Sequence, residues 1–508
     1  MKELDHDIRI LLNQATVLHR QGDREAARII YKNVIEKDPN EPNAWHLLGV
    51  ASWQDKDLES AEEYIRKAIG LHNSAALYYS NLGGILRQKG DLKDSISQYE
   101  KAHLLDPYSE SVKKELSQTL HRHALALTEE RKWVEVKTAY NRVLELEPDN
   151  IPTLNNLAAV IQYLDSRAEA ITYYNKALAV DPKNLLVLYN RSICYLTDQR
   201  LEEGWVDFAE GKQHWRRLQD NREHLPWTNI PLWNKEDLIG KEILIWGNQG
   251  IGDEIIYASM VPEIIERKAI ITIECHPRLV SLFERSFPET RVLPRQNPPL
   301  PDAHYDYQAP GMWLACQLRN NKDAFSKSAS FLKADSDLTK ILRQRYRAFG
   351  KKYIVGLSWF TVSPVWGKAR SIPLPDMLKT LPLKDMLIID MQYGKTEQAW
   401  HEARQVFPEL TIFHDTDIDQ FQDMDSFASQ VAACDVIYTI SNTTSHVAGA
   451  LGVPSVVLMS DIGLTWYWFS EGSHCPWYPS LYLLRPSETN RYEKAAELLQ
   501  KMAFNQAA

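Results

Sequence analysis

Large apolar side chains recur with a regular period from the N-terminus of the chain to Leu218. The interval between them is about 34 residues, except that one interval is about seven positions longer, and a small side chain stands four positions before most of them. Proline or asparagine follows each group at the same distance, and proline cannot continue a helix. This spacing predicts pairs of packed helices. The large residues are Tyr31, Ile65, Tyr99, Tyr140 and Tyr174, and the small ones are Ala27, Ala61, Ser95 and Ala170.

A unit of two antiparallel helices with a period of about 34 residues is typical of the tetratricopeptide repeat. The stretches Trp45-x-x-Leu-Gly49 and Tyr79-x-x-Leu-Gly83 match the usual first helix of that unit. We therefore predict an α-helical solenoid, a tetratricopeptide superhelix of five to six repeats, over residues 1–218. The one longer interval predicts a lengthened helix near residues 108–116, and residues 185–218 form a degenerate last unit. An unrelated helical bundle is the alternative, which the agreement of several positions in one register disfavours.

The predicted solenoid also indicates a binding surface. Stacked repeats expose an extended concave face, so we expect this groove to bind a protein or a peptide segment. Self-association through the same repeats is the alternative.

The periodicity changes after residue 218. Residues 219–240 are rich in proline and tryptophan and predict a linker that lies on a surface. From residue 241 onwards, short apolar runs alternate with helical stretches, and this βαβ pattern implies parallel sheets. We predict two Rossmann-like domains, at 241–348 and 349–486, and a final helix within 487–508.

A glycine-rich loop, Gly247-Asn-Gln-Gly250-Ile-Gly252-Asp253, follows the first predicted strand at 242–246. Glycines let a backbone turn tightly and approach a ligand, and the N-terminus of the expected helix at 253–267 favours an anion. Asp253 would stand at the carboxyl end of a strand, where open α/β sheets bind their ligands. Two alternatives stay open. One is a dinucleotide fold with Glu274 as the ribose acid, although the glycines run G-x-x-G-x-G, and the other is a structural turn.

Two further motifs follow predicted strands of the second domain. Ser358, Lys368 and Arg370 could clamp a diphosphate, although a solvated basic loop has the same composition. The other motif is a hydroxyl-rich turn that leads into a helix, where amides and hydroxyls can bind phosphate oxygens. Its polar residues are Ser441, Asn442, Thr443, Thr444 and His446. For His446, a purely structural role is the alternative to ligand binding.

In this order the three motifs resemble those of the GT-B glycosyltransferases, specifically the heptosyltransferase-like group, whose members often carry tetratricopeptide repeats. The resemblance runs from Leu225 to Pro486 and includes the G-x-G-D loop, the R-S-I-P-L segment that starts at Arg370, and the Trp466-Tyr-Trp and Cys475-Pro-Trp-Tyr-Pro clusters. It implies a GT-B fold, in which two Rossmann-like domains face a cleft.

The resemblance also implies an activity and its residues. A nucleotide-sugar donor would be held mainly by the C-terminal domain, with Asp253 as the catalytic base of an inverting displacement. No metal and no other cofactor is implied. The candidate donor and phosphate contacts are Gly250, Gly252, Ser358, Lys368, Arg370, Gln392, Ser441, Asn442, Thr443, Thr444 and His446.

Two departures from the group's pattern bear on donor choice and turnover. Ser441-Asn442 stands where the third motif often begins Asp-Thr, and Asn248 stands where the first loop often has glutamate. The acidic segment 414–425 could suggest a metal loop, but it lacks the glycine of a calcium-binding hand. We expect it to form a surface loop before a helix at 426–434, with Asp425 as the N-cap.

The net charge and the cysteine pattern indicate which partners and which cellular compartment to expect. The net charge of -9 argues against nucleic acid as a partner. Five cysteines without a C-x-x-C pair favour free thiols in a reducing cytosol, so we expect a cytoplasmic protein. Neither a signal peptide nor an apolar run long enough to span a bilayer is visible.

These features favour a bacterial glycosyltransferase that modifies a protein acceptor captured by its repeats, such as a flagellin. A transferase acting on a lipid-linked or polysaccharide acceptor is the first alternative. A non-catalytic adaptor with a degenerate transferase domain is the second.

Overall fold

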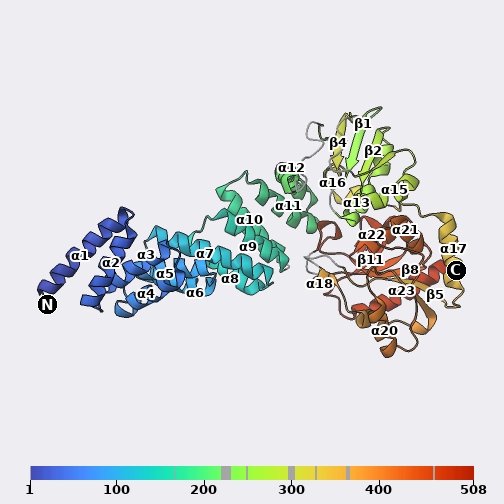
Figure 1. Cartoon of the computed structure of the whole chain (residues 1–508). Coiled ribbons are helices and arrows are strands. Elements are labelled where there is room, and N and C mark those ends of the chain that lie inside the picture. The colour runs from blue at the N-terminus through green and yellow to red at the C-terminus, as the bar shows by residue number, and fades with distance from the viewer. Residues whose placement is uncertain are drawn as a thin grey trace. The chain divides into compact units, whose positions relative to one another are not determined.

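The computed structural model describes residues 2–164, 166–218, 230–247, 250–295, 304–326, 329–361, 367–460 and 464–507. The chain forms two compact units, residues 1–182 and residues 183–508 (Figure 1). Most of the expected linker, residues 219–229, lies outside the described residues, as does Asn248.

The first unit is an array of antiparallel helical pairs, which confirms the predicted helical solenoid. Each pair joins two helices through a short turn, as in α3 and α4. The helices are α1 (Lys2–Arg20), α2 (Arg24–Lys37), α3 (Pro42–Gln54), α4 (Leu58–Leu71), α5 (Ala76–Lys89), α6 (Leu92–Leu105), α7 (Glu110–Glu129), α8 (Trp133–Leu146), α9 (Ile151–Tyr163) and α10 (Arg167–Val180).

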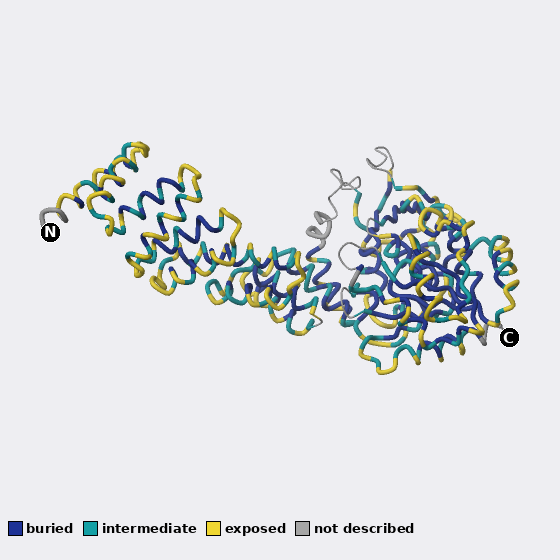
Figure 2. Tube along the Cα trace, turned by 60° about the horizontal axis from the view of Figure 1, so that its bottom comes forward, coloured by how far each residue is buried: buried dark blue, intermediate teal, exposed yellow. Residues whose placement is uncertain are grey.

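The periodic residues pack as the spacing predicts. All five large residues of the second helices are 2% exposed or less, and the small residues four positions earlier are fully buried. A Cβ at Gly83 would lie 2.9 Å from the ring of Tyr99, so glycine is what allows these two helices to approach. Buried and exposed positions alternate along the array helices (Figure 2). In the second unit, the strands at 353–357, 386–390 and 436–440 are buried at every position.

Side-chain caps fix the starts of three second helices, and they recur at the repeat interval. The carboxylates of Asp23, Asp57 and Asp91 each accept a hydrogen bond from the backbone N–H three residues later. Such a cap contributes about 1 kcal/mol, because it satisfies a backbone donor that the helix leaves unpaired. The predicted lengthened helix is also confirmed: α7 has 20 residues, whereas α5 has 14 and α9 has 13.

The second unit opens with another helical pair, α11 (Leu185–Thr197) and α12 (Leu201–Leu218). This pair continues the repeat spacing, yet it packs with the α/β part of the chain. A Cβ at Gly204 would lie 2.7 Å from the side chain of Leu196, so the pair keeps the close helix approach of a repeat.

Two sheets follow, and they confirm the predicted α/β region with parallel strands. The smaller sheet has the order β3-β2-β1-β4, and all of its pairings are parallel. The larger sheet has the order β10-β11-β9-β8-β5-β6-β7, in which the pairings are parallel except at the β10 edge. The strands are β1 (Glu242–Trp246), β2 (Ile270–Cys275), β3 (Arg291–Pro294), β4 (Tyr307–Pro310), β5 (Tyr353–Leu357), β6 (Met386–Asp390), β7 (Thr411–Phe413), β8 (Val436–Ile440), β9 (Ser455–Leu458), β10 (His474–Cys475) and β11 (Tyr478–Leu484).

Both faces of the larger sheet are buried. Ile354 and Ile437 belong to one apolar cluster, whereas Val355 and Val436, on the opposite face of the same strands, belong to another. A parallel sheet buried on both faces is typical of doubly wound α/β folds. The helices of this unit are α13 (Ile251–Ala258), α14 (Val261–Ile265), α15 (Val280–Ser286), α16 (Gly311–Leu318), α17 (Ser336–Arg347), α18 (Gly367–Arg370), α19 (Leu374–Leu378), α20 (Glu397–Val406), α21 (Met424–Ala432), α22 (Thr443–Leu451) and α23 (Arg491–Ala507), with short 3-10 helices η1 (Pro277–Leu279), η2 (Lys322–Phe325), η3 (Leu383–Asp385) and η4 (Trp466–Trp468).

Two local expectations were wrong. The helix expected at 253–267 breaks after Ala258 into α13 and α14, because Pro262 has no N–H to continue the ladder. The N-cap of α21 is Asp423 and not Asp425, whose carboxylate instead pairs with the guanidinium of Arg285. Strands β3, β4, β10 and β11 were not among the expected elements.

Candidate functional site

Asp253 lies in the first turn of α13, directly after the carboxyl end of β1. The N–H of Gly250 donates to its Oδ2 at 3.0 Å, so the carboxylate is fixed against its own helix N-terminus. The hydroxyl of Tyr467 donates to Oδ1 at 2.9 Å. Tyr467 is in η4, more than two hundred residues away in the chain, so the fold brings this hydroxyl to the carboxylate.

The glycines of the loop serve packing and not an unusual backbone conformation. None of Gly247, Gly250 and Gly252 has a positive φ. A Cβ at Gly252 would lie 2.6 Å from the ring of His446, and one at Gly247 would lie 2.5 Å from the side chain of Glu254. The loop is therefore glycine-rich because two other side chains occupy the space that a Cβ would need.

His446 is in the first turns of α22 and is 4% exposed. Its Nδ1 lies 3.1 Å from the hydroxyl of Tyr478, and its ring packs against Tyr467 and Trp468. Burial, and to a smaller extent the charge of Arg370, lowers its pKa to about 3. The imidazole is therefore neutral at physiological pH, where it can donate or accept a hydrogen bond but carries no charge.

This histidine should make folding stability fall in mild acid. A base whose pKa is lowered by folding stabilises the protein above its unfolded pKa, and that stability is lost as pH falls towards the folded pKa. For a shift from 6.5 to about 3, the loss between pH 7.5 and pH 5 amounts to about 2 kcal/mol. Denaturant unfolding of the wild-type chain and of His446→Asn at the two pH values measures it, and we expect the variant to lose that much less.

Comparing the pH dependence of stability in the two proteins removes contributions to stability that do not come from His446 titration. His446→Asn lowers stability at every pH through lost packing, so only the difference between the two pH values is diagnostic. His46 in the array also has a pKa lowered by burial, to about 4, but it is unchanged in both proteins. Identical pH dependence in the two proteins would contradict a buried neutral His446.

The charges around Asp253 suit a proton acceptor. Burial raises the pKa of its carboxyl, while the bonds from Tyr467 and Gly250 and the charge of Arg370 lower it. Burial lowers the pKa of Arg370, and the nearby charge of Asp253 partly offsets this effect. A carboxylate with a raised pKa is a better base than one in free solution, and a neighbouring guanidinium can pair with an anion.

A second group of polar residues lies where β5 and β8 end. The hydroxyl of Ser358 accepts a hydrogen bond from the amide of Asn442 at 2.5 Å, and the hydroxyls of Thr439 and Thr444 lie 3.4 Å from it. Asn442 is also the N-cap of α22, so the predicted hydroxyl-rich turn is in contact with the predicted Ser358. Together these residues surround the N-terminus of the helix that carries His446.

The remaining candidates are Ser441, Thr443, Lys368 and Gln392. Ser441 is buried beside the turn, Thr443 begins α22, and the backbone of Lys368 lies in α18, although its side chain is outside the described residues. Gln392 is fully buried, and its side-chain oxygen accepts hydrogen bonds from the N–H groups of Trp359 and Phe360. In this structure Gln392 therefore supports the segment that follows Ser358.

The alternatives that rested on acidic residues receive little support. Glu274 is buried beside a cavity of about 20 Å³, which has room for about one water molecule and not for a ribose. In the acidic segment, Asp415 pairs with Arg345, and Asp423 caps α21. These carboxylates are engaged by protein groups.

Sequence reasoning missed the tyrosines around Asp253. Besides Tyr467, the charge of Asp253 acts on Tyr189 of α11 and on Tyr257 of α13, and burial raises the pKa of both hydroxyls, that of Tyr189 to about 12. Tyrosines placed so far apart in the chain give no common spacing. The one available signal was the Trp466-Tyr-Trp cluster, whose middle residue is the hydrogen-bond donor.

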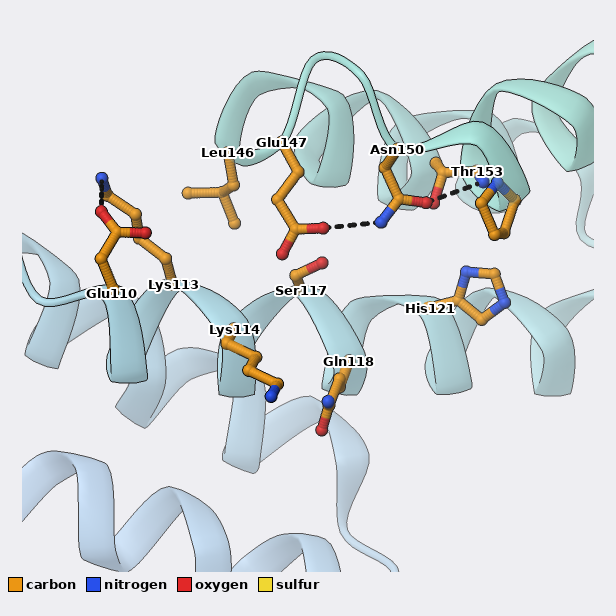
Figure 3. A pocket seen from close by; sticks show the side chains of 11 residues that line it. Glu110, Lys113, Lys114, Ser117, Gln118, His121, Leu146, Glu147, Asn150 and Thr153 are labelled. Atoms are coloured by element: carbon orange, nitrogen blue, oxygen red, sulfur yellow. Dashed lines mark hydrogen bonds and ion pairs between the residues drawn. The ribbon is translucent and has the colours of Figure 1, made fainter. Parts of the chain in front are cut away.

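The array carries a separate hollow of about 630 Å³. Figure 3 shows one face of α7, with Lys114 and His121, opposite the segment that joins α8 to α9. Thr153 is fully buried at its edge, and its hydroxyl has no hydrogen-bond partner among the described residues. Lys113 is paired with Glu110, whereas no ion pair of Lys114 is found in the described part of the chain. The hollow is thus a recess in the array whose lining residues are mostly polar.

Comparison with known proteins identifies the repeats. Residues 12–76, 76–108 and 151–184 match models of the tetratricopeptide repeat, so the first unit is a tetratricopeptide solenoid. Solved structures similar to this chain include YrrB, described as a tetratricopeptide protein with an unusual peptide-binding site, at 19% identity over 35% of this chain and 88% of that one, with a TM-score of 0.28. They also include MamA, at 21% identity over 36% and 94%, with a TM-score of 0.29.

Two curated relatives are similar in sequence. Protein FlbA of Caulobacter vibrioides is 24% identical over 440 residues, 83% of this chain and 66% of the relative. A match of that length exceeds either compact unit, so it covers parts of both. A Caenorhabditis elegans UDP-N-acetylglucosamine–peptide N-acetylglucosaminyltransferase is 36% identical over 80 residues, 15% of this chain and 7% of the enzyme. The chain thus spans less than two thirds of each relative. No described helix is long and apolar enough to cross a membrane.

Proposed function

We propose that this protein is a GT-B glycosyltransferase that moves a sugar from a nucleotide-sugar donor to a protein acceptor captured by its tetratricopeptide array. One observation carries the proposal. Asp253, after a strand of the smaller sheet, is joined by Tyr467 and lies within reach of the charge of Arg370, and both of these residues follow strands of the larger sheet. Sugar transfer uses a base to take a proton from the acceptor and a cation to stabilise the leaving phosphate. Here the base and the cation come from the two α/β halves.

The proposed reaction is a direct displacement at the anomeric carbon. The acceptor hydroxyl oxygen attacks that carbon while Asp253 takes its proton, and the bond from the carbon to the donor phosphate oxygen breaks. The configuration of the sugar inverts because attack and departure occur on opposite faces. The nucleoside diphosphate leaves with the electron pair of the broken bond.

The donor side of the proposal uses the second half of the α/β unit. Arg370 offers two parallel N–H groups to a phosphate, and Lys368 stays a predicted phosphate contact. The N-terminus of α22, with the hydroxyl of Thr444 beside it, favours the departing negative charge. Gly252 brings α13 against His446, and so holds the base close to this helix.

The array hollow is the proposed contact with the acceptor. Its volume of about 630 Å³ accommodates a few residues of an extended segment, and most of its lining residues are polar. The exposed ammonium of Lys114 can pair with a carboxylate of the acceptor. A flagellin is the first acceptor to test.

Charge reversal at Lys114 should separate capture from chemistry. Co-expression with candidate flagellins, followed by intact-mass measurement, reports transfer as a sugar-sized mass increase of the acceptor. We expect Lys114→Glu to reduce the modified fraction by about threefold or more, because one exposed ion pair lost and one repulsion gained amount to about 1 kcal/mol. Hydrolysis of the free donor should not change, because the hollow is in the other compact unit.

Lys67→Glu is the matched control, since Lys67 is an exposed lysine of α4 outside the hollow. It should leave modification at the wild-type level. Equal loss in both variants would mean that net charge, and not the hollow, affects capture. Absence of any mass increase with wild-type protein, together with absence of donor hydrolysis, would contradict the transferase itself.

A second candidate, a non-catalytic tetratricopeptide adaptor, is favoured by the bonding of Asp253. Both of its oxygens accept hydrogen bonds from protein groups, as those of a structural capping residue do. In that case the α/β unit would bind a nucleotide-sugar without turnover. Acceptor binding by the array together with no transfer and no donor hydrolysis would distinguish this function.

A further inference from the structure

The last helical pair, α11 and α12, is bound to the α/β part of the second unit through specific groups. The indole N–H of Trp205 in α12 donates to the backbone oxygen of Arg319 at 2.8 Å. The ring of Trp205 meets that of Trp466 edge to face, with 5.2 Å between the ring centres. At the end of α11, the oxygen of Thr197 accepts a hydrogen bond from the N–H of Ser470 at 2.8 Å.

These contacts converge on one short element, η4, and on the residues that follow it. Trp466 begins η4, and Ser470 lies two residues beyond its end. Between them stands Tyr467, whose hydroxyl donates to Asp253 at 2.9 Å. η4 is a single turn, and its own backbone bonds are those of Trp468 and Phe469 to the residues three before them. So short an element has few bonds of its own, and its position depends on what packs against it.

We infer that the last helical pair is a structural part of the Asp253 site: Trp205 is a positioning residue that holds η4, and η4 holds the Asp253 carboxylate through Tyr467. Trp205 itself touches neither Asp253 nor any reacting atom, so it acts through Trp466 and Tyr467. The repeat spacing assigns this pair to the array, but the pair packs against the α/β part and stabilises the site there.

The position of α11 fits the same role. Burial raises the pKa of the hydroxyl of Tyr189 in α11, and the nearby charge of Asp253 raises it further. A Cβ at Gly211 of α12 would lie 2.9 Å from the backbone N of Tyr189, so the two helices are pressed together at this point. The helical pair therefore supports the site at two places, through Trp205 on α12 and beside Tyr189 on α11.

The simpler account is that the pair only covers apolar surface of the α/β part. Under that account, weakening the pair anywhere would lower stability, with no special effect on η4. Arg191 provides the matched comparison, because its guanidinium joins α11 to α12 through Asp207 at 2.6 and 2.8 Å. Arg191→Met loosens the pair without removing a group that contacts η4.

Hydrogen exchange of the full-length chain tests the positioning without any substrate. The reporters are the amides of Trp468, Phe469 and Ser470, each of which is hydrogen-bonded in the folded chain. We expect Trp205→Leu to speed their exchange by about tenfold or more, and Trp205→Phe, which keeps a ring against Trp466, to speed it less. Arg191→Met should leave these amides near the wild-type rate. Unchanged exchange in a folded Trp205→Leu protein would overturn the inference.

The pH profile of transfer is the second measurement, and it alone rests on the proposed function. The bond from Tyr467 lowers the pKa of Asp253, so its loss raises that pKa and moves the acid limb of kcat/KM to higher pH. Trp205→Leu should shift the limb in that direction in the wild-type background and not in Tyr467→Phe. A further shift in Tyr467→Phe would overturn the route through Tyr467.

The two measurements distinguish failure of the inference from failure of the proposed function. If the wild-type chain transfers no sugar, the proposed function fails, while hydrogen exchange still decides whether Trp205 holds η4. If transfer occurs but neither the exchange rate nor the acid limb changes in Trp205→Leu, the inference fails and the transferase stands.

Discussion

Asp253→Asn should abolish measurable sugar transfer while leaving the chain folded. Asparagine has the shape of aspartate and can still accept the hydrogen bond from Gly250, but it cannot take a proton. Removing a general base typically costs between about a hundredfold and ten-thousandfold in rate. Intact-mass measurement of a co-expressed acceptor, and kcat/KM for donor consumption, report the loss.

The stability of this variant is part of the prediction. Folding raises the pKa of the Asp253 carboxyl, chiefly through burial, so the folded state holds this proton more tightly than the unfolded state does. Its contribution to stability is therefore lost as pH rises through the folded pKa, and at neutral pH the ionised carboxylate is a cost. We expect Asp253→Asn to have an equal or higher Tm at pH 7 to 8. Full transfer activity in Asp253→Asn would remove Asp253 from its proposed role and leave it as a capping residue.

Gly252→Ala should both destabilise the α/β unit and impair transfer. The new methyl group would lie 2.6 Å from Cδ2 and 3.0 Å from Nε2 of His446, whose ring is buried and cannot swing away. Overpacking of this kind costs about 1–3 kcal/mol. It would also separate α13 from α22, and so move Asp253 away from the donor side. Denaturant unfolding and transfer measured on the same preparations check both effects.

Two further variants test whether the loss comes from the contact between the new methyl group and His446. Gly70→Ala in α4 adds a methyl group with no atom within 4 Å, so stability should be unchanged or higher by about 0.5–1 kcal/mol. Combining Gly252→Ala with His446→Ala should recover part of the loss, because the ring that meets the methyl group is gone. Full additivity of the two changes would mean that the clash is absorbed elsewhere.

Much of the fold could be predicted because its causes are local. The repeat residues pack within their own helical pair or the next one, so Tyr31 and its equivalents recur at the spacing that the packing demands. The carboxylates of Asp23, Asp57 and Asp91 repeat for the same reason. Strand β1 was predicted with its observed bounds, since a buried apolar run before a helix carries a strong pattern.

The candidate site could be predicted only in part. Ser358, Asn442 and Thr444 stand at strand ends and a helix start, and their contact follows from the geometry of a parallel sheet. The reason for Gly252 could not be read from the loop, because the ring that requires it comes from α22. Asp425 was mistaken for a cap, because its partner Arg285 is 140 residues away.

The sequence by itself determined the helical pairs, the change to an α/β pattern and the identity of the candidate base, because each rests on neighbours within a few tens of residues. Only the tertiary structure decided what surrounds that base. Tyr467 reaches Asp253 across more than two hundred residues, and Trp205, in a pair that the spacing assigns to the array, lies against the element that carries it. Contacts between residues so distant in the chain leave no periodic signal, since they depend on how whole elements pack.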